Sequence, residues 1–232
     1  MHPTDKAARI AGAAYLSLLI TGPFSLIYIP SKLYVHGNAT ATGNNILNHE
    51  MLFRLGIVAE LIGSVFFIFV AMALYRLLSG VNTTIASQMV VLAVVSATAG
   101  FVNVLNNIAA LTLFRGADFL AVLEKPQRDA LAMLFVRLHG QGILINEIFW
   151  GLWLLPFGLL VMRSGFLPRI LGFLLIVNCV AYVAVSLTGL LLPDYASVVN
   201  RFATIPETGE LWIILWLVIR GARVQPLAAA AT

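Results

Sequence analysis

The feature that most constrains this chain is a series of apolar segments, several of them about twenty residues long, which is the length that a helix needs to cross a bilayer. Inside the hydrocarbon core the backbone has no water to bond, so only helices and closed barrels can span it. Strands of a barrel would alternate apolar and polar residues, and these segments do not. The sequence therefore predicts an all-α fold, a polytopic transmembrane helical bundle that forms a single domain.

Six membrane-spanning helices are expected, over residues 10–29, 52–78, 85–114, 140–162, 170–192 and 202–219. The segment 30–51 is rich in Asn, Gly and Thr, which is typical of a polar loop. Pro126 can open a helix that lies at the interface and then continues into the fourth span. We see no clear inverted repeat and no broken helix. Residues 222–232 are of low complexity and are expected to form a flexible tail.

Composition supports the membrane assignment and excludes other classes. Hydrophobic residues make up 60% of the chain and charged residues 10%, against about a quarter in a soluble domain. The net charge is +4, but lysine and arginine stand singly or in pairs between apolar segments, as helix anchors do, so no nucleic-acid partner is expected. Cys179 is the only cysteine, which excludes an internal disulfide and a cysteine metal cluster.

The distribution of positive charge predicts the orientation. Short basic turns, which include Arg76 and Arg163, fall on the same side as Lys6 and Arg9. Positive charge in short loops marks the cytoplasmic side, so both ends of the bundle are expected in the cytoplasm. Residues 10–29 are too long for the apolar core of a signal peptide and are expected to stay as the first span.

Three carboxylates interrupt the apolar spans. Glu60 is early in the second span, Glu147 early in the fourth and Glu210 early in the sixth. Because consecutive spans run in opposite directions, the start of an even-numbered span and the end of an odd-numbered one lie on the same side. Polar residues in these positions should therefore form a layer in one leaflet. They include Tyr28, Asn103, Asn106, Asn107, His139, Asn146, Ser186 and Thr188.

The free-energy cost of placing ionised groups in lipid predicts that the side chains of this layer face the interior of the bundle. An ionised group at membrane depth costs about 2.5–3.5 kcal/mol on insertion scales, so the carboxylates are expected to share Asn, His and water inside the bundle. Desolvation and mutual repulsion favour the protonated form, so at least one should hold a proton near neutral pH. The expected catalytic residues are Glu147, Glu60 and Glu210. The expected substrate-binding residues are Trp150, Trp153, Trp212, Asn103, Asn107, Asn146 and His139, with the tryptophans as an aromatic floor.

Each candidate also has a structural explanation. Glu210 could sit in the first turn of a late-starting helix, where an acid suits the positive helix end. Glu60 could pair with Arg54 or hydrogen-bond between helices. His139 and the tryptophans could be interfacial residues. No metal site is expected, because no His or Glu pair within a span has the spacing of di-iron bundles, and no cofactor motif is present.

Two segments carry a family resemblance. They are "EIFWGLWLLPFGLLVMRSGFLPRILGFLLIVNC" at residues 147–179 and "GELWIILWLVIRG" at residues 209–221. They resemble the bacterial membrane proteins of the DUF4386 family, which have a Glu-Ile-Phe-Trp-Gly-Leu-Trp-Leu-Leu-Pro run, a Ser-Gly-Phe-Leu-Pro turn and a late Gly-Glu-Leu-Trp segment. The resemblance implies a six-helix membrane protein and supplies no activity; the membrane is expected to be the bacterial cytoplasmic (inner) membrane. Its signature positions are Glu147, Trp150, Trp153, Pro156, Gly209 and Glu210.

Three functions fit these observations. The first is an enzyme or binding protein that acts on an apolar, lipid-like or isoprenoid-like molecule by acid–base chemistry, with aromatic faces to stabilise a developing cation. The second is a proton-coupled transporter or channel; the absence of broken helices counts against it, and a homo-oligomer would count for it. The third is a structural or sensory protein in which the polar layer joins helices. The sequence favours the first, with membrane lipids and an apolar small molecule as partners.

Overall fold

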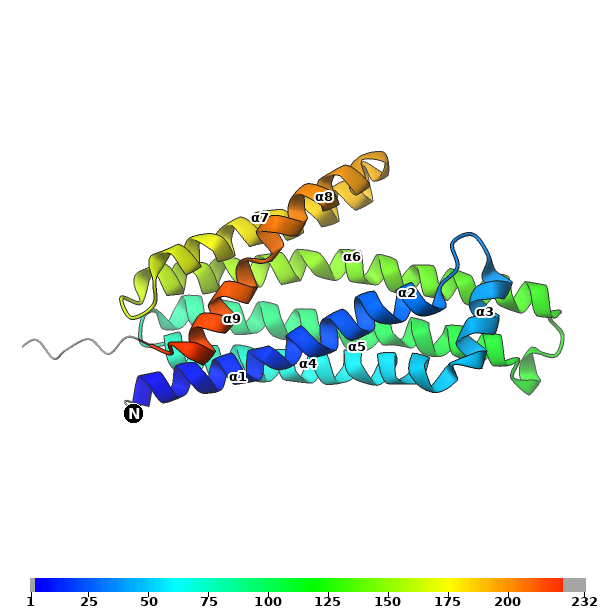
Figure 1. Cartoon of the computed structure of the whole chain (residues 1–232), viewed down its shortest axis with the longest axis horizontal. Coiled ribbons are helices and arrows are strands. Elements are labelled where there is room, and N and C mark those ends of the chain that lie inside the picture. The colour runs from blue at the N-terminus through cyan, green and yellow to red at the C-terminus, as the bar shows by residue number, and fades with distance from the viewer. Residues whose placement is uncertain (1–2, 223–232) are drawn as a thin grey trace, which may run out of the picture. The chain divides into compact units, whose positions relative to one another are not determined.

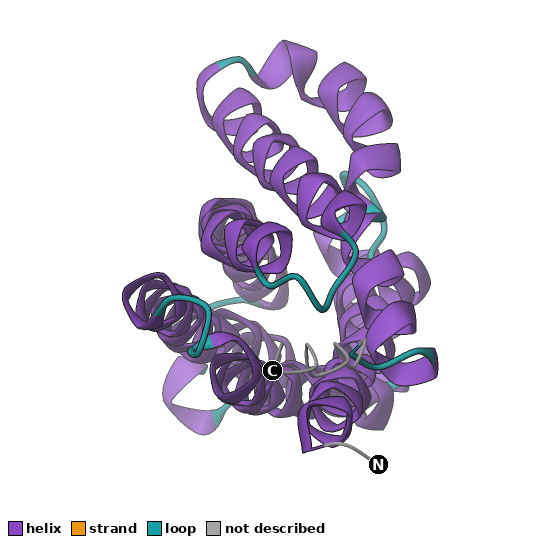
Figure 2. Cartoon of the chain, turned by 90° about the vertical axis from the view of Figure 1, so that its left-hand side faces the viewer, coloured by secondary structure: helices purple, strands orange, loops and turns teal. Residues whose placement is uncertain are grey.

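A computed structural model describes residues 3–222 of the chain, so the expected tail lies almost wholly outside the described residues. Within this range every regular element is helical and none is a strand (Figure 2). Six segments are long and apolar enough to cross a membrane: Thr4–Leu33, Glu50–Leu78, Thr83–Arg115, Lys125–Arg163, Arg169–Leu191 and Pro193–Ile219. The predicted fold class, an all-α polytopic membrane protein, is confirmed.

The first span consists of three consecutive elements. Helix α1 (Pro3–Pro23) leads into a π-helical segment, η1 (Phe24–Tyr28), which is followed by α2 (Ile29–Leu33) (Figure 1). Pro23 and Pro30 flank the π-helical segment, and neither has an N–H to donate to the helical ladder. The first span is therefore not a uniform α-helix.

The next three spans are uninterrupted. They are α4 (Glu50–Leu78), α5 (Thr83–Arg115) and α6 (Lys125–Arg163), and a short 3-10 helix, η2 (Asp118–Leu120), precedes the last of them. The helix expected at the interface after Pro126 and the fourth span form one helix of 39 residues. A span needs about twenty residues, so α6 is long enough to extend beyond the bilayer core.

The segment expected to be a polar loop, residues 30–51, contains a helix, α3 (Ala39–Asn48). Asn38 caps this helix, because its side-chain oxygen accepts a hydrogen bond from the N–H of Ala41 at 2.8 Å. Thr42 and Ile46 are four residues apart, and both are fully buried on the same face. The loop prediction is wrong here because the Asn and Thr residues that suggested turns instead cap the helix and pack its buried face.

The sixth span is interrupted, which corrects the expectation that no span is broken. Helix α7 (Arg169–Leu191) is followed by a 3-10 helix, η3 (Pro193–Tyr195), by α8 (Ala196–Glu207) and by α9 (Gly209–Ile219), and Figure 1 shows a bend between α8 and α9. Pro206 cannot donate a backbone hydrogen bond, so the ladder weakens just before the break at Thr208.

Contacts divide the chain into two compact units, and the division falls inside α1, α4, α5 and α6. The Trp153 unit comprises residues 1–16, 67–95 and 147–232, and the His139 unit comprises residues 17–66 and 96–146. The buried core of the His139 unit includes Ile29, Leu33, Ile46, Phe53, Val104 and Phe114.

Close helix packing holds the Trp153 unit together. The Trp153 side chain is 1% exposed, and its ring lies 4.8 Å from that of Phe67, centroid to centroid. Glycines let α6 and α7 approach: a Cβ atom added to Gly158 would lie 2.7 Å from the carbonyl oxygen of Gly172. Small residues at helix contacts are typical of membrane proteins, where close van der Waals packing drives association.

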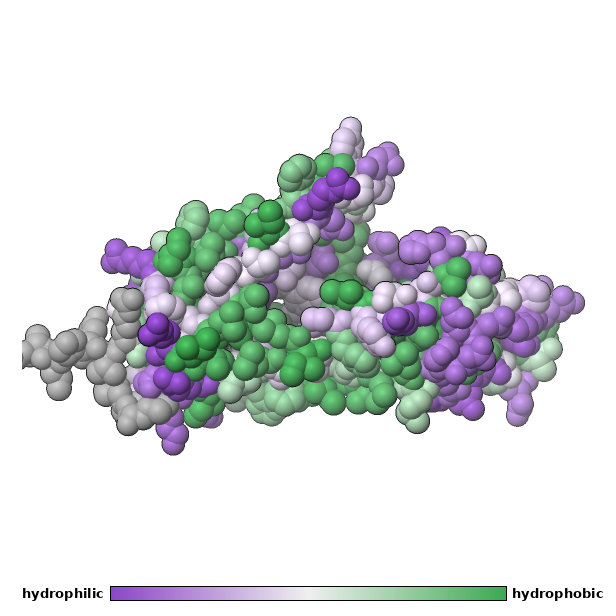
Figure 3. Space-filling view, in the orientation of Figure 1, coloured by the Kyte–Doolittle hydropathy of each residue, from purple (hydrophilic) through white to green (hydrophobic). Residues whose placement is uncertain are grey.

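The exposed side chains of the spans are largely apolar. Val102, Leu105 and Phe173 are 61%, 59% and 54% exposed, and Figure 3 shows hydrophobic residues over much of the visible surface of the spans. Exposure of so much apolar surface is unfavourable in water, whereas in a bilayer these side chains contact lipid. The chain is an integral membrane protein.

Candidate functional site

The buried polar side chains form two clusters, one in each unit. Of the residues expected at the site, the His139 unit contains Glu60, Asn103, Asn107, His139 and Asn146. The Trp153 unit contains Glu147, Glu210, Trp150, Trp153 and Trp212. The residues expected in a single layer are therefore distributed over two units.

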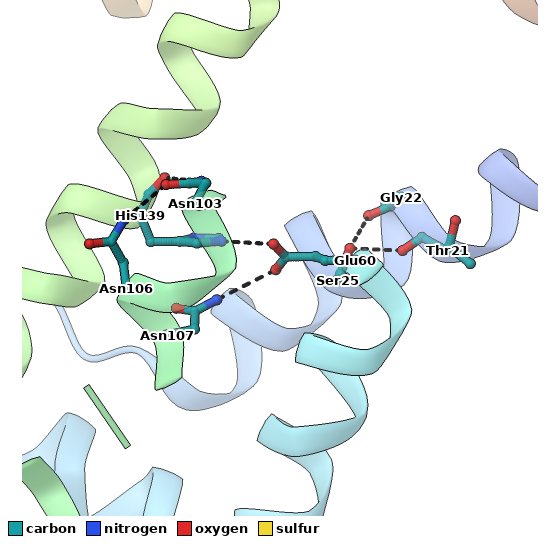
Figure 4. A network of polar contacts seen from close by, with 8 residues as sticks. All are labelled: Thr21, Gly22, Ser25, Glu60, Asn103, Asn106, Asn107 and His139. Carbon is teal, nitrogen blue, oxygen red and sulfur yellow. Dashed lines mark hydrogen bonds and ion pairs between the residues drawn. The ribbon is translucent and has the colours of Figure 1, made fainter. Parts of the chain in front are cut away.

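The first cluster centres on a contact between Glu60 on α4 and His139 on α6 (Figure 4). The Nε2 atom of His139 lies 2.8 Å from Oε2 of Glu60, and the two side chains are only 7% and 13% exposed. The side chain of Asn107, on α5, donates to Oε1 of Glu60 at 3.5 Å, the outer limit of a hydrogen bond. Two helices, α5 and α6, thus supply polar groups to a carboxylate on α4.

Two asparagine side chains stabilise the position of His139 through its backbone. The Nδ2 group of Asn103 donates to the backbone carbonyl of His139 at 2.9 Å, and Asn106 donates to Asn103 at 3.1 Å (Figure 4). Gly142 leaves room for Asn103, because a Cβ atom at position 142 would overlap that side chain. The Oδ1 atom of Asn107 is buried and has no hydrogen-bond partner among the described residues.

Other residues near this cluster have separate roles. Asn146 accepts a hydrogen bond from Ser96 at 3.0 Å. Arg54 pairs with Glu50 at 2.7 Å, so the suggested pairing of Arg54 with Glu60 is wrong. Tyr34 lies just beyond the first span; its burial, and then the negative charge of Glu60, raise the pKa of its phenol, which keeps the hydroxyl neutral.

The second cluster is built around Glu210, in the first turn of α9. Two tyrosine hydroxyls donate to its carboxylate: Tyr15 on α1 to Oε1, and Tyr182 on α7 to Oε2 at 3.4 Å. The first turn also places the acid at the positive end of α9, as one of the structural explanations expected. Helices α1, α7 and α9 therefore meet at this carboxylate.

Two further carboxylates lie near Tyr182. Glu147 on α6 and Glu207 at the end of α8 both interact electrostatically with this tyrosine, as Glu210 does, and Glu147 and Glu207 also interact with each other. The Oε2 atom of Glu147 is buried and finds no hydrogen-bond partner within residues 3–222. Ion pairs within the same residues involve none of the three acids. The cluster is thus rich in acids that lack a basic counterpart in the described structure.

Helix α7 braces the interruption between α8 and α9. Asn178 is fully buried, and its Nδ2 group donates to the backbone carbonyl of Glu207 at 3.3 Å. On the other side of the break, a Cβ atom added to Gly209 would lie 2.8 Å from the carbonyl oxygen of Leu174. The break therefore has a defined position against α7, with one acid on each side of it.

The three expected substrate-binding tryptophans have different surroundings. The Trp150 ring makes an edge contact with Tyr182, at 6.1 Å between centroids, and so lies beside the carboxylates. Trp153 is enclosed by the rings of Tyr15, Phe67 and Phe157. Trp212 is 54% exposed. Of the three, Trp150 is the one placed to contact a molecule at the acids.

Four residues of the second cluster were not among the predicted site residues: Tyr15, Asn178, Tyr182 and Glu207. Their signal in the sequence is weak, since a single hydroxyl or amide inside an apolar run is common. Their role becomes visible only when α1, α7 and α9 are brought together. Within residues 3–222, no three His, Cys, Asp or Glu side chains form a group able to hold a metal ion.

These observations define a class: an all-helical, multi-pass membrane protein with two buried clusters of acidic and polar side chains and an interrupted sixth span. The family described as "Domain of unknown function (DUF4386)" matches residues 10–221. The chain belongs to this family. Comparison with curated proteins and with solved structures gives no match.

Proposed function

We propose that the protein binds a largely apolar, positively charged small molecule at the carboxylates of the Trp153 unit, and that binding displaces a proton from Glu147, as in a proton-coupled transporter. The observation that carries the proposal is the buried Oε2 atom of Glu147, which lacks a hydrogen-bond partner among the described residues. An unpaired buried acceptor costs about 1–3 kcal/mol. A bound proton or a polar group of a ligand would remove this cost, so Glu147 is suited to exchange one for the other.

The residues around Glu147 support this exchange. Tyrosine hydroxyls donate to both oxygens of Glu210, which stabilises its negative charge without a basic residue. The Oε2 atom of Glu147 has no such donor within the described residues, and the carboxylate is repelled by the charge of Glu207. A proton on Glu147, or a ligand with a basic nitrogen, would reduce that repulsion. The Trp150 and Tyr182 rings suit a lipophilic cation, that is, a positively charged ligand with apolar groups, since aromatic faces attract cations.

The interrupted sixth span favours transport over catalysis. Transporters place substrates and coupling ions at discontinuous helices, where freed backbone groups and helix ends provide ligands. Here the break at Thr208 separates Glu207 from Glu210. A change in the bend between α8 and α9 would move the two acids relative to each other, which would couple the shape of the span to the occupancy of the site.

Acid–base processing of a lipid-like or isoprenoid-like substrate is the second candidate function. The position of Trp150, one helical turn after Glu147, favours it. An aromatic face there could stabilise a developing cation while the acid donates a proton. The two candidate functions share a ligand site and differ in whether the ligand leaves unchanged.

We also propose that the protein lies in the bacterial cytoplasmic membrane with both ends of the bundle in the cytoplasm. Arg76 and Arg163 lie in the last turns of α4 and α6, next to short connections, which supports this orientation. Single cysteines at Gly80 and Val122, in a variant with Cys179 replaced by Ala, test it with a membrane-impermeant thiol reagent. Intact cells should label position 122 and not position 80, and the reverse pattern would overturn the orientation.

Proton release on ligand binding tests the proposed function. Purified protein in weakly buffered detergent is mixed with tetraphenylphosphonium, a lipophilic cation, and a pH indicator follows the proton. We expect release from wild type and none from Glu147→Gln. Glu124→Gln removes an exposed acid and is the matched control, which should behave as wild type. In liposomes without a membrane potential, a proton gradient should drive uptake of the cation through wild type above the level seen with Glu147→Gln.

The outcomes separate the candidate functions. Binding without proton release, or release that Glu147→Gln leaves unchanged, would overturn proton exchange at this residue. Conversion of a neutral isoprenoid such as farnesol, detected by mass spectrometry and abolished in Glu147→Gln, would favour the acid–base enzyme. Folded wild type that neither binds nor transports either probe would indicate that the acids serve structure alone.

A further inference from the structure

A groove lies at one end of α4 and α5 in the His139 unit, apart from the carboxylate clusters. Its volume is about 270 Å³, and it is lined by Arg54, Ile57, Val58, Ile108, Leu111, Thr112 and Arg115. The two arginines lie at the beginning of α4 and at the last residue of α5. The proposed function does not use any of these residues.

The groove is cationic at the helix ends. Both arginines contact the same carboxylate oxygen of Glu50, Arg54 through Nε at 2.7 Å and Arg115 through Nη1 at 3.5 Å. Two guanidinium groups thus share one negative charge and leave a net positive charge. The two side chains are 45% and 56% exposed, so the N–H groups that do not contact Glu50 are accessible. They can therefore donate to a phosphate, which arginine recognises well.

The remainder of the groove is apolar and lies deeper along the same helices. Ile57 and Val58 follow Arg54 by about one helical turn, and Leu111 and Ile108 precede Arg115 by about one and two turns. Leu111 is 5% exposed and forms the floor, whereas Val58 and Ile108 are 46% and 45% exposed and form the rim. The hydroxyl of Thr112 is already bonded to the backbone carbonyl of Ile108 at 2.9 Å, so it adds no free polar group to the wall.

The polarity of the groove therefore changes along the axis of the span, from paired arginines at the helix ends to isoleucine, valine and leucine inside. A phospholipid has the same sequence of groups, with the phosphate at the level of the helix ends and acyl chains in the core. A free anion would match the arginines but not the apolar wall. A lipid without net charge would match the wall but gain less from the positive end.

We propose that this groove binds an anionic phospholipid, with its phosphate on Arg54 and Arg115 and the upper part of one acyl chain against Ile57, Val58, Ile108 and Leu111. The rest of the lipid remains in the bilayer, which is consistent with a volume smaller than that of a whole lipid. The site gives the protein a fixed lipid contact at one end of the α4–α5 pair.

Native mass spectrometry of the full chain, titrated with dioleoylphosphatidylglycerol or dioleoylphosphatidylcholine in mild detergent, tests this site. We expect wild type to bind the anionic phosphatidylglycerol more tightly than the zwitterionic phosphatidylcholine. Arg54→Gln with Arg115→Gln should weaken that binding about thirty-fold, because each arginine near an anionic surface contributes about a factor of five. The matched control is Arg76→Gln with Arg163→Gln, which removes two helix-end arginines that do not line the groove and should leave the affinity unchanged.

A second variant separates the groove from general charge attraction and from loss of folding. Ile108→Trp fills the rim of the groove without changing any charge. It should weaken binding of phosphatidylglycerol, while the circular dichroism spectrum and the thermal unfolding temperature stay as in wild type. Equal affinity for the two lipids, equal weakening in the control pair, or full displacement of the lipid by excess inorganic phosphate would overturn the proposal. None of these outcomes depends on proton release at Glu147.

Discussion

The contact between Glu60 and His139 makes a quantitative prediction about the first cluster. Interhelical hydrogen bonds in membrane proteins contribute about 0.6 kcal/mol on average and at most about 1.7 kcal/mol. Hydrogen bonds to charged groups contribute about 1.5–3 kcal/mol. The two side chains lie 2.8 Å apart and are 7% and 13% exposed, so little water screens them. We therefore expect a coupling free energy in the upper range, about 1.5–3 kcal/mol.

A double-mutant cycle measures this coupling. The free energy of unfolding of wild type, Glu60→Gln, His139→Gln and the double variant is obtained from titration with sodium dodecyl sulfate in mixed micelles, followed by circular dichroism. Asn82→Ala is the control, because its side chain caps the start of α5 through the N–H of Ile85 and shares no partner with the pair, so its effect should add to that of Glu60→Gln. A coupling of about 0.6 kcal/mol or less would refute the argument, since the pair would then contribute no more than an ordinary interhelical hydrogen bond.

Three further predictions concern the Trp153 unit and are tested by thermal unfolding in detergent. Trp153→Ala should lower the unfolding free energy by about 3–5 kcal/mol because it empties a ring-lined core, whereas Trp212→Ala, at a site 54% exposed, should change it little. Gly172→Ala should cost about 1–3 kcal/mol because the new Cβ atom would meet the backbone of α6, and Gly22→Ala, where nothing lies within 4 Å, should not destabilise. Tyr182→Phe removes one donor to Glu210 and should cost about 0.6–1.7 kcal/mol, unlike a Phe replacement at the exposed Tyr195.

The number of spans and their approximate positions could be predicted from the sequence because span length and hydropathy are properties of contiguous residues. The same holds for the presence of Glu60, Glu147 and Glu210 inside the spans. Two local predictions failed for local reasons. The segment 30–51 contains α3 because Asn38 acts as a helix cap, and the sixth span breaks at Thr208, after Pro206.

Side-chain partners could not be predicted, since they depend on which helices become neighbours. Glu60 contacts a histidine 79 residues away, and Tyr15 donates to an acid 195 residues away. The sequence by itself determined that the chain crosses a membrane about six times and carries acids there, because a bilayer constrains each segment separately. Only the tertiary structure decided which acids accept hydrogen bonds and which, like Glu147, have an oxygen without a donor among the described residues. The reason is that hydrogen bonds need partners within about 3 Å, and helix packing sets those distances.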